Sequence, residues 1–156
     1  MKDIQYIKGD ATSPQKLGNK IIVHICNDIG GWGKGFVMAI SKRWKKPENQ
    51  YREWFKSKDN FELGEVQFVQ VQEDLWVANL IGQHKINKDE NGAAPIRYNA
   101  IEEGLDKVCS FGKENNATIH MPRIGCGLAG GKWEIIEPII LKTLSEHNIE
   151  VIVYDF

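Results

Sequence analysis

The chain of 156 residues has few cysteines and no long apolar run. Its three cysteines, Cys26, Cys109 and Cys126, form no CxxC pair. A small, odd number of cysteines without a secretory signal is typical of a reducing cytoplasm. No stretch of apolar residues is long enough to span a bilayer. We therefore expect a cytoplasmic protein with no membrane partner.

The sequence also has no charge excess, with a net charge of −1 at pH 7. Proteins whose main task is to bind nucleic acid usually carry a basic excess, so we expect no nucleic-acid partner. We interpret the one basic run, residues 42–46, as the solvated end of a helix rather than a phosphate-binding patch. No histidines, cysteines and carboxylates have the spacing of metal ligands, so we expect no metal and no cofactor.

Hydrophobic patterning predicts strands that alternate with helices. The apolar run at 20–26 is typical of a buried central strand, and apolar segments around the polar turn at 72–74 predict a hairpin. We expect further strands at 4–7, 118–121 and 151–154, and helices at 36–44, after Pro47, at 98–113 and at 133–147. Pro138 either delays the start of the last helix or kinks it.

The predicted order is β-α-β-α-α-β-β-α-β-α-β, with a helical turn after the first strand. This order favours a single α/β domain over residues 1–156, with helices on both faces of a largely parallel sheet. The hairpin makes the sheet mixed. We also expect a monomer.

Two glycine-rich loops, at 27–35 and 122–131, each follow a predicted strand and precede a helix. Glycine lets the backbone approach a ligand closely, and a helix N-terminus adds partial positive charge. Ligands of such sheets bind at the carboxyl ends of the strands, so the loops predict a groove that holds a diphosphate from both sides. The loops match neither GxGxxG nor a Walker A motif nor a C-x5-R phosphatase loop.

Three motifs together resemble the macro domain family. They are Gly9-Asp10-Ala11-Thr12, the glycine loop at 30–35, and Pro122-Arg123-Ile124-Gly125-Cys126-Gly127-Leu128 followed by Trp133-Glu134. The chain is most similar to the small branch with the ADP-ribose-1″-phosphate phosphatases and the terminal ADP-ribose protein glycohydrolase. The resemblance implies a three-layer α-β-α fold with a mixed, roughly six-stranded sheet, and a groove for ADP-ribose or an ADP-ribosylated substrate.

The resemblance also implies how one end of the groove would hold adenine. The Asp10 carboxylate would accept a hydrogen bond from the adenine amino group, and the Ala11 N–H would donate to a ring nitrogen. Alternatively, Asp10 caps a helical turn over residues 11–17. Tyr154 or Phe156, at the end of the last strand, would lie near adenine or pack in the core.

For the pyrophosphate and the distal ribose, the resemblance implies binding by the backbone N–H groups of both loops. The other residues expected to line the groove are Gly31, Trp32, Gly33, Gly35, Gln83, His84, Arg97, Tyr98, Gly125, Cys126, Gly127 and Leu128. Arg97 would bind a phosphate, or it is a surface arginine. We interpret Cys126 as a small packing residue rather than a nucleophile, and Arg123 as structural or peripheral.

The catalytic pattern of the family is incomplete in this chain. The glycohydrolase uses a lysine and an aspartate where this sequence has Gln83 and Ala129, and neither replacement performs that chemistry. His24 stands where a histidine is implicated in the phosphatase-like relatives, so it is the catalytic candidate, with Asn27 beside it to reach the distal ribose. The alternatives are a core histidine and a local Asx turn.

We therefore expect a hydrolase of ADP-ribose derivatives, either an ADP-ribose-1″-phosphate phosphatase or an ADP-ribosyl-ester hydrolase. The alternative is an ADP-ribose-binding module without catalysis. A more remote alternative is a nucleotide-binding α/β domain for another ligand, such as a dinucleotide oxidoreductase.

Overall fold

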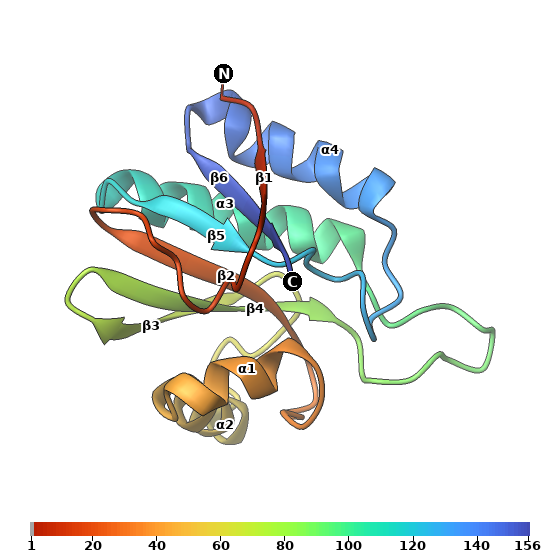
Figure 1. Cartoon of the computed structure of the whole chain (residues 1–156). Coiled ribbons are helices and arrows are strands. Elements are labelled where there is room, and N and C mark those ends of the chain that lie inside the picture. The colour runs from red at the N-terminus through yellow and green to blue at the C-terminus, as the bar shows by residue number, and fades with distance from the viewer. Residues whose placement is uncertain (1) are drawn as a thin grey trace.

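A six-stranded sheet forms the centre of the computed structural model, which describes residues 2–156 (Figure 1). Its strands are β1 (Gln5–Lys8), β2 (Lys20–Asn27), β3 (Val66–Gln72), β4 (Leu75–Gln83), β5 (Thr118–Met121) and β6 (Val151–Asp155). They lie in the order β1-β6-β5-β2-β4-β3, and all neighbours pair in parallel except the hairpin strands β3 and β4. The predicted mixed sheet and its hairpin are confirmed.

Helices cover both faces of the sheet, which gives the predicted three layers. The helices are α1 (Phe36–Arg43), α2 (Lys46–Ser57), α3 (Tyr98–Glu114) and α4 (Trp133–Thr143). The pair α1 and α2 lies on one face and the pair α3 and α4 on the other (Figure 1). Buried apolar side chains fill both interfaces: Ile40 and Tyr51 on the first face, and Ile101, Leu105, Ile136 and Ile140 on the second. The strand β2 lies between β5 and β4 and is buried along nearly all of its length, which explains why most of its residues are apolar.

Two sequence predictions are wrong. No helix follows β1, because residues 9–19 form turns and bends with Gly18 at φ +86°. The last helix does not run to residue 147, since α4 ends at Thr143 and a 3₁₀ turn, Ser145–His147, follows it. Its start is not delayed, because α4 begins at Trp133 and contains Pro138.

Five parallel strands bring their carboxyl ends to one edge of the sheet: β1, β6, β5, β2 and β4. The segments that follow β1, β2 and β5 are therefore neighbours in space, although more than a hundred residues separate the first from the last. Within residues 2–156, no helix is both long enough and apolar enough to cross a membrane.

Candidate functional site

Three adjoining cavities form a groove along this edge of the sheet. The first cavity has a volume of about 640 Å³, the middle one about 310 Å³ and the third about 500 Å³. Gly35, Phe36 and Pro122 line both the first and the middle cavity. Gln83 and Leu128 are among the residues that line both the middle and the third cavity. The two glycine loops therefore lie on one continuous groove, as the sequence predicted.

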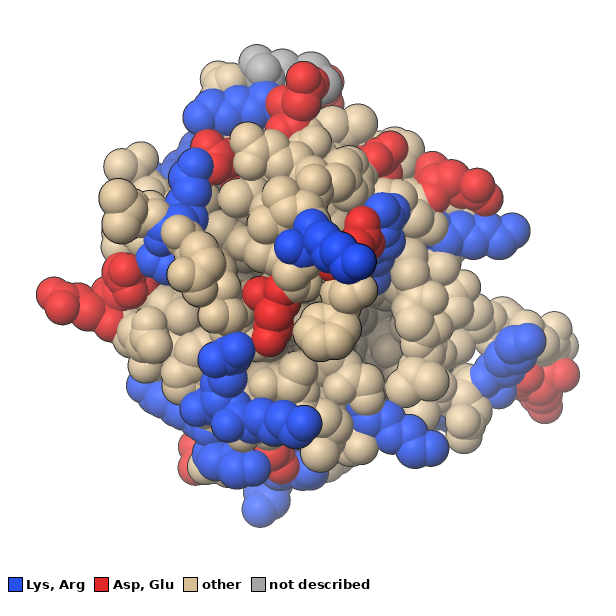
Figure 2. Space-filling model, viewed as in Figure 1, with Lys and Arg blue, Asp and Glu red and all other residues tan. Residues whose placement is uncertain are grey.

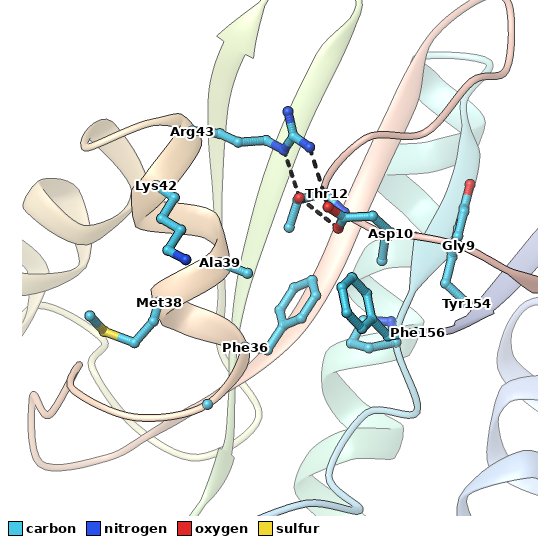
Figure 3. Close-up of a pocket in the computed structure, with 13 residues that line it drawn as sticks. Gly9, Asp10, Thr12, Phe36, Met38, Ala39, Lys42, Arg43, Tyr154 and Phe156 are labelled. Carbon is cyan, nitrogen blue, oxygen red and sulfur yellow. Dashed lines mark hydrogen bonds and ion pairs between the residues drawn. The ribbon is translucent and has the colours of Figure 1, made fainter.

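Asp10 lies at the first cavity, within a set of hydrogen bonds that joins two distant segments (Figure 3). Its Oδ1 accepts hydrogen bonds from the Thr12 N–H at 2.9 Å and the Thr12 hydroxyl at 2.7 Å. Arg43, from the last turn of α1, donates from Nη2 to Asp10 Oδ2 at 3.2 Å and from Nε to the Thr12 hydroxyl at 2.7 Å. Burial opposes ionisation of Asp10, but the bonds from Thr12 and Arg43 outweigh it and lower the pKa of this carboxyl.

The alternative role of Asp10, capping a helix over residues 11–17, is wrong. Its backbone carbonyl accepts from the Ser13 N–H at 3.0 Å, which makes a turn and not a helix. The next residue, Ala11, is buried at the wall of the first cavity. Its N–H donates no hydrogen bond to any of residues 2–156, so it is free to meet a ligand.

Aromatic side chains form much of the remaining wall of the first cavity. Phe36 and Phe156 lie below Asp10 in Figure 3. Tyr154 also lines this cavity, but its ring is 7% exposed and its hydroxyl is hydrogen-bonded with His120 Nδ1 at 2.7 Å. Both expected places for Tyr154, the ligand wall and the core, therefore apply to the same ring.

Asn27 ends β2 and organises the first glycine loop. Its Oδ1 accepts from the N–H groups of Ile29 at 3.1 Å and Gly31 at 2.9 Å, and lies 2.9 Å from the Tyr51 hydroxyl. Its Nδ2 donates to the Gly31 carbonyl at 2.9 Å. The amide of Asn27 thus forms the local Asx turn that was the alternative to ligand contact, although Asn27 still lines the third cavity. Its direct effect is on the shape of the loop.

The rest of this loop shapes the third cavity and leads into α1. Gly31 and Gly33 line the cavity, and a Cβ at Gly33 would have no atom within 4 Å. Trp32 also lines it, but its ring is 5% exposed and its Nε1 donates to Ser41 at 2.8 Å. Trp32 therefore anchors the loop on the core.

The N-terminus of α1 opens onto the first and middle cavities. Gly35 precedes the helix at φ +83°, no side chain caps it, and no acidic residue lies in its first turn. The N–H groups of Phe36 and Val37 donate to no acceptor within residues 2–156. Unpaired donors at a helix N-terminus without a nearby carboxylate are suited to an anion.

The second glycine loop faces this helix end across the middle cavity. Gly125 adopts φ +73°, and a Cβ there would lie 2.7 Å from Ile96 Cδ1. The Gly131 N–H closes the loop on the Gly125 carbonyl at 2.7 Å. Within the described chain, the N–H groups of Gly127 and Leu128 have no acceptor, and both residues line the middle cavity. Leu128 is 67% exposed, which leaves its side chain available for contact with a ligand.

Four residues expected to line the groove line none of its three cavities: His84, Arg97, Tyr98 and Cys126. The Tyr98 hydroxyl accepts instead from the Lys132 N–H at 3.1 Å. Arg97 donates from Nη1 to the carbonyls of Ala94, Pro95 and Ile96 at 2.7 to 3.0 Å, so it holds its own loop together outside the three cavities. Cys126 packs against the core instead of lining a cavity, and burial raises the pKa of its thiol, which agrees with a packing residue. Arg123 does line the middle cavity, but its guanidinium forms a bidentate ion pair with Asp155 at 2.7 and 3.0 Å, which agrees with a structural role.

His24 lies at the wall of the middle cavity but is only 1% exposed. Its Nε2 lies 2.5 Å from Asn79 Oδ1. The Asn79 amide nitrogen donates to Pro47 and Gln67, so Oδ1 is the acceptor and His24 Nε2 carries the proton. His24 Nδ1 then has a free lone pair and no partner within the described residues. Burial lowers the pKa of His24 to about 4, so the ring is neutral at pH 7.

Two contacts around the groove have no signal in the sequence. Asp28 binds His84 Nδ1 at 2.7 Å and the Lys85 N–H at 2.7 Å, and so ties the first glycine loop to the segment after β4. Arg43 belongs to the basic run 42–46 that the sequence predicts as a solvated helix end, yet its partners lie 31 and 33 residues away. Neither pair has a local sequence pattern, and only a folded structure brings them together. Gln83 lines two cavities, as expected, and its Nε2 donates to the Lys85 carbonyl at 2.9 Å.

Charge is unevenly distributed on the face that carries the groove. Figure 2 shows lysine and arginine side chains gathered over the part of the molecule that α1 and α2 form. Residues 2–156 contain no group of three or more histidines, cysteines or carboxylates that could hold a metal ion.

No family model matches the chain. Among curated proteins it is 33% identical over 160 residues to the chromodomain-helicase-DNA-binding protein 1-like of Danio rerio, with 97% of this chain and 15% of that protein covered. The chain thus spans about a sixth of the length of the first curated relatives that it matches. It is 27% identical to the ADP-ribose 1″-phosphate phosphatase of Candida albicans, with 96% of this chain and 99% of that protein covered.

Solved structures give nearer matches over the full length. A protein of unknown function from Bacteroides thetaiotaomicron is 59% identical, with a TM-score of 0.99 and 99% of both chains covered. A macrodomain protein from Streptomyces coelicolor is 49% identical, with a TM-score of 0.87 and 99% of both chains covered.

Proposed function

The chain belongs to the macro domain family, and on that premise we propose that it binds ADP-ribose and hydrolyses ADP-ribose derivatives. The substrate is either ADP-ribose 1″-phosphate or an ADP-ribosyl ester on a protein. A relative that covers nearly the same length carries the name of an ADP-ribose 1″-phosphate phosphatase, which supports this class of substrate.

One observation carries the proposal: N–H groups without an acceptor within residues 2–156 meet at the middle of the groove from the first glycine loop, from the second and from the N-terminus of α1. They belong to Lys34 and Gly35, to Gly127 and Leu128, and to Phe36 and Val37, which all line the middle cavity. A diphosphate placed there accepts hydrogen bonds from both sides and lies at the positive end of the helix. The acceptor Asp10 and the aromatic wall then lie at one end, where an adenine fits. The third cavity, lined by Asn27, Gly31 and Gly33, is left for the distal ribose and the group attached to it.

For the hydrolytic step, His24 remains the candidate, in a narrower role. A neutral imidazole with a pKa of about 4 is a weak base at pH 7, and its Nδ1 lies buried with a free lone pair behind the wall of the middle cavity. His24 would therefore act on the attacking water only where a side chain of this wall moves aside, and Asn27 would act through the loop that it holds. No lysine or aspartate of the glycohydrolase type takes part, because Gln83 and Ala129 stand at those positions.

The test is a hydrolysis assay on both substrates. Purified protein is incubated with a glutamate-linked ADP-ribosylated protein and, separately, with ADP-ribose 1″-phosphate, and the released ADP-ribose is quantified by chromatography. We expect release from at least one substrate, and loss of release in Asp10→Ala. If ADP-ribose binds while neither substrate is converted, the chain is a binding module. If ADP-ribose does not bind, the proposal fails. A monomeric state and a cytoplasmic location stay predictions.

A further inference from the structure

Asp10, Ala11 and Arg43 all line the first cavity and bring hydrogen-bonding groups to it. Asp10 supplies an acceptor. The Ala11 N–H is a donor with no acceptor within residues 2–156. Arg43 Nη2 is a second donor, 3.2 Å from Asp10 Oδ2. The wall of this cavity therefore offers two donors beside one acceptor.

The edge of adenine has the complementary groups. Its N1 is an acceptor, its 6-amino group is a donor and its N7 is an acceptor. The Ala11 N–H and the Asp10 carboxylate account for N1 and the amino group. Nothing assigned so far meets N7, and the guanidinium bonded to Asp10 Oδ2 is the remaining donor of the three groups.

Arg43 has donors to spare for this contact. Its bonds to Thr12 and Asp10 use Nε and Nη2, and a guanidinium carries more N–H groups than these two bonds occupy. Its side chain is 43% exposed and lines the cavity together with the rings in Figure 3. The bonds to Thr12 and Asp10 also hold the planar group in place before a ligand arrives, which lowers the entropic cost of the contact.

We propose that Arg43 is a specificity-determining residue that donates a hydrogen bond to adenine N7 beside Asp10. Arg43 and Asp10 then discriminate together. Arginine alone favours a 6-oxo purine, because its donors match both O6 and N7 of guanine. The Asp10 carboxylate repels that O6 and accepts from the 6-amino group, so the pair selects adenine. This inference rests on the proposed binding of ADP-ribose and concerns its base.

The first arm of the test compares ADP-ribose with its 7-deaza analogue, in which a C–H replaces N7. Affinities are measured by isothermal titration calorimetry for the wild type, Arg43→Met and the control Lys45→Met. A lost charge-assisted hydrogen bond weakens binding about tenfold or more. We expect the wild type and Lys45→Met to bind 7-deaza-ADP-ribose about tenfold more weakly than ADP-ribose. We expect Arg43→Met to bind both compounds equally.

The second arm changes the acceptor. In Asp10→Asn, the two donors of Thr12 hold the amide oxygen, so the amide nitrogen takes the place of Oδ2 and faces the ligand. Arg43 loses its bond to Oδ2 but keeps its Nε bond to the Thr12 hydroxyl. We expect this variant to narrow the wild-type preference for ADP-ribose over inosine diphosphate ribose, a 6-oxo purine whose O6 accepts from these donors while its N1–H still faces the Ala11 N–H. The narrowing should be smaller in the double variant Asp10→Asn with Arg43→Met, because it needs the arginine donors. A purely structural arginine would not change the ratio of the two affinities.

The outcomes separate this inference from the proposed function. If the wild type does not bind ADP-ribose, the proposed function fails and the inference fails with it. If the wild type binds but Arg43→Met keeps the wild-type ratio of affinities for ADP-ribose and its 7-deaza analogue, the inference alone is overturned. The melting temperature of each variant shows whether a loss of binding comes from unfolding. The ratio of the affinities of one variant for two ligands does not depend on how much of that variant is folded.

Discussion

Replacing Asn27 by alanine tests whether this residue holds the first glycine loop in shape or contacts the ligand directly. The side chain takes part in four hydrogen bonds, three at Oδ1 and one at Nδ2. The Tyr51 hydroxyl retains an acceptor in the variant, because it also lies 2.6 Å from the Asn27 carbonyl. Three bonds are then lost. At about 1 kcal/mol each, Asn27→Ala should lower the free energy of unfolding by ~3 kcal/mol.

The assay for Asn27→Ala is thermal unfolding followed by circular dichroism, with and without ADP-ribose. For a chain of this size, a loss of ~3 kcal/mol lowers the melting temperature by roughly 6–12 °C. The matched control is Asn91→Ala, since Asn91 is exposed and its side chain makes no hydrogen bond within residues 2–156. A variant that melts with the wild type yet binds ADP-ribose far more weakly would refute the reasoning, because Asn27 would then contact the ligand directly.

Three further predictions use other parts of the groove and the core. Gly33→Leu should melt like the wild type but bind ADP-ribose at least about tenfold more weakly in a calorimetric titration, because the added side chain enters the third cavity. Gly125→Ala should instead lower the free energy of urea unfolding by about 1–3 kcal/mol, because its backbone conformation is strained for alanine. Similar effects of the two variants on stability would contradict the loop geometry. Burial lowers the pKa of His24 and of His120 to about 4, against 6.5 in the unfolded chain, so the unfolded state binds more protons between these two pH values. The free energy of unfolding should therefore be highest above pH 6.5 and fall by ~3 kcal/mol per histidine as the pH drops to 4. A free energy of urea unfolding that stays constant between pH 7 and 5 would contradict this prediction. His24→Gln should leave the dissociation constant of ADP-ribose within about threefold while lowering kcat at least about tenfold, and an unchanged kcat would remove His24 from the reaction.

Much of the architecture was predictable because it depends on local patterns. The apolar run at 20–26 predicted the central strand, and the polar turn at 72–74 predicted the hairpin; both are confirmed. The helix expected after the first strand was wrong, because the Asp10 side chain bonds the backbone two residues ahead and forms a turn instead. Asp is suited to both structures, so the sequence alone did not decide between them.

The positions of the two glycine loops on the groove can be predicted from where the strands end, whereas the hydrogen-bond partners of the side chains cannot. The loops after β2 and β5 meet because parallel strands end at one edge, and this was deducible from the order of elements. The direction of the Arg97 guanidinium, the partner of Arg43 and the contact of Asp28 with His84 depend on rotamers and on segments far apart in the chain. Patterns of hydrophobicity carry no information about such contacts.

The most direct test of the account is phosphorus NMR of ADP-ribose 1″-phosphate during titration with the protein, without added metal. If the unpaired N–H groups of the two loops and of α1 bind the diphosphate, both of its resonances shift or broaden as protein is added, and hydrolysis of this substrate adds a signal from inorganic phosphate. Diphosphate resonances that stay sharp and unshifted at saturating protein would contradict the central claim that this groove holds ADP-ribose.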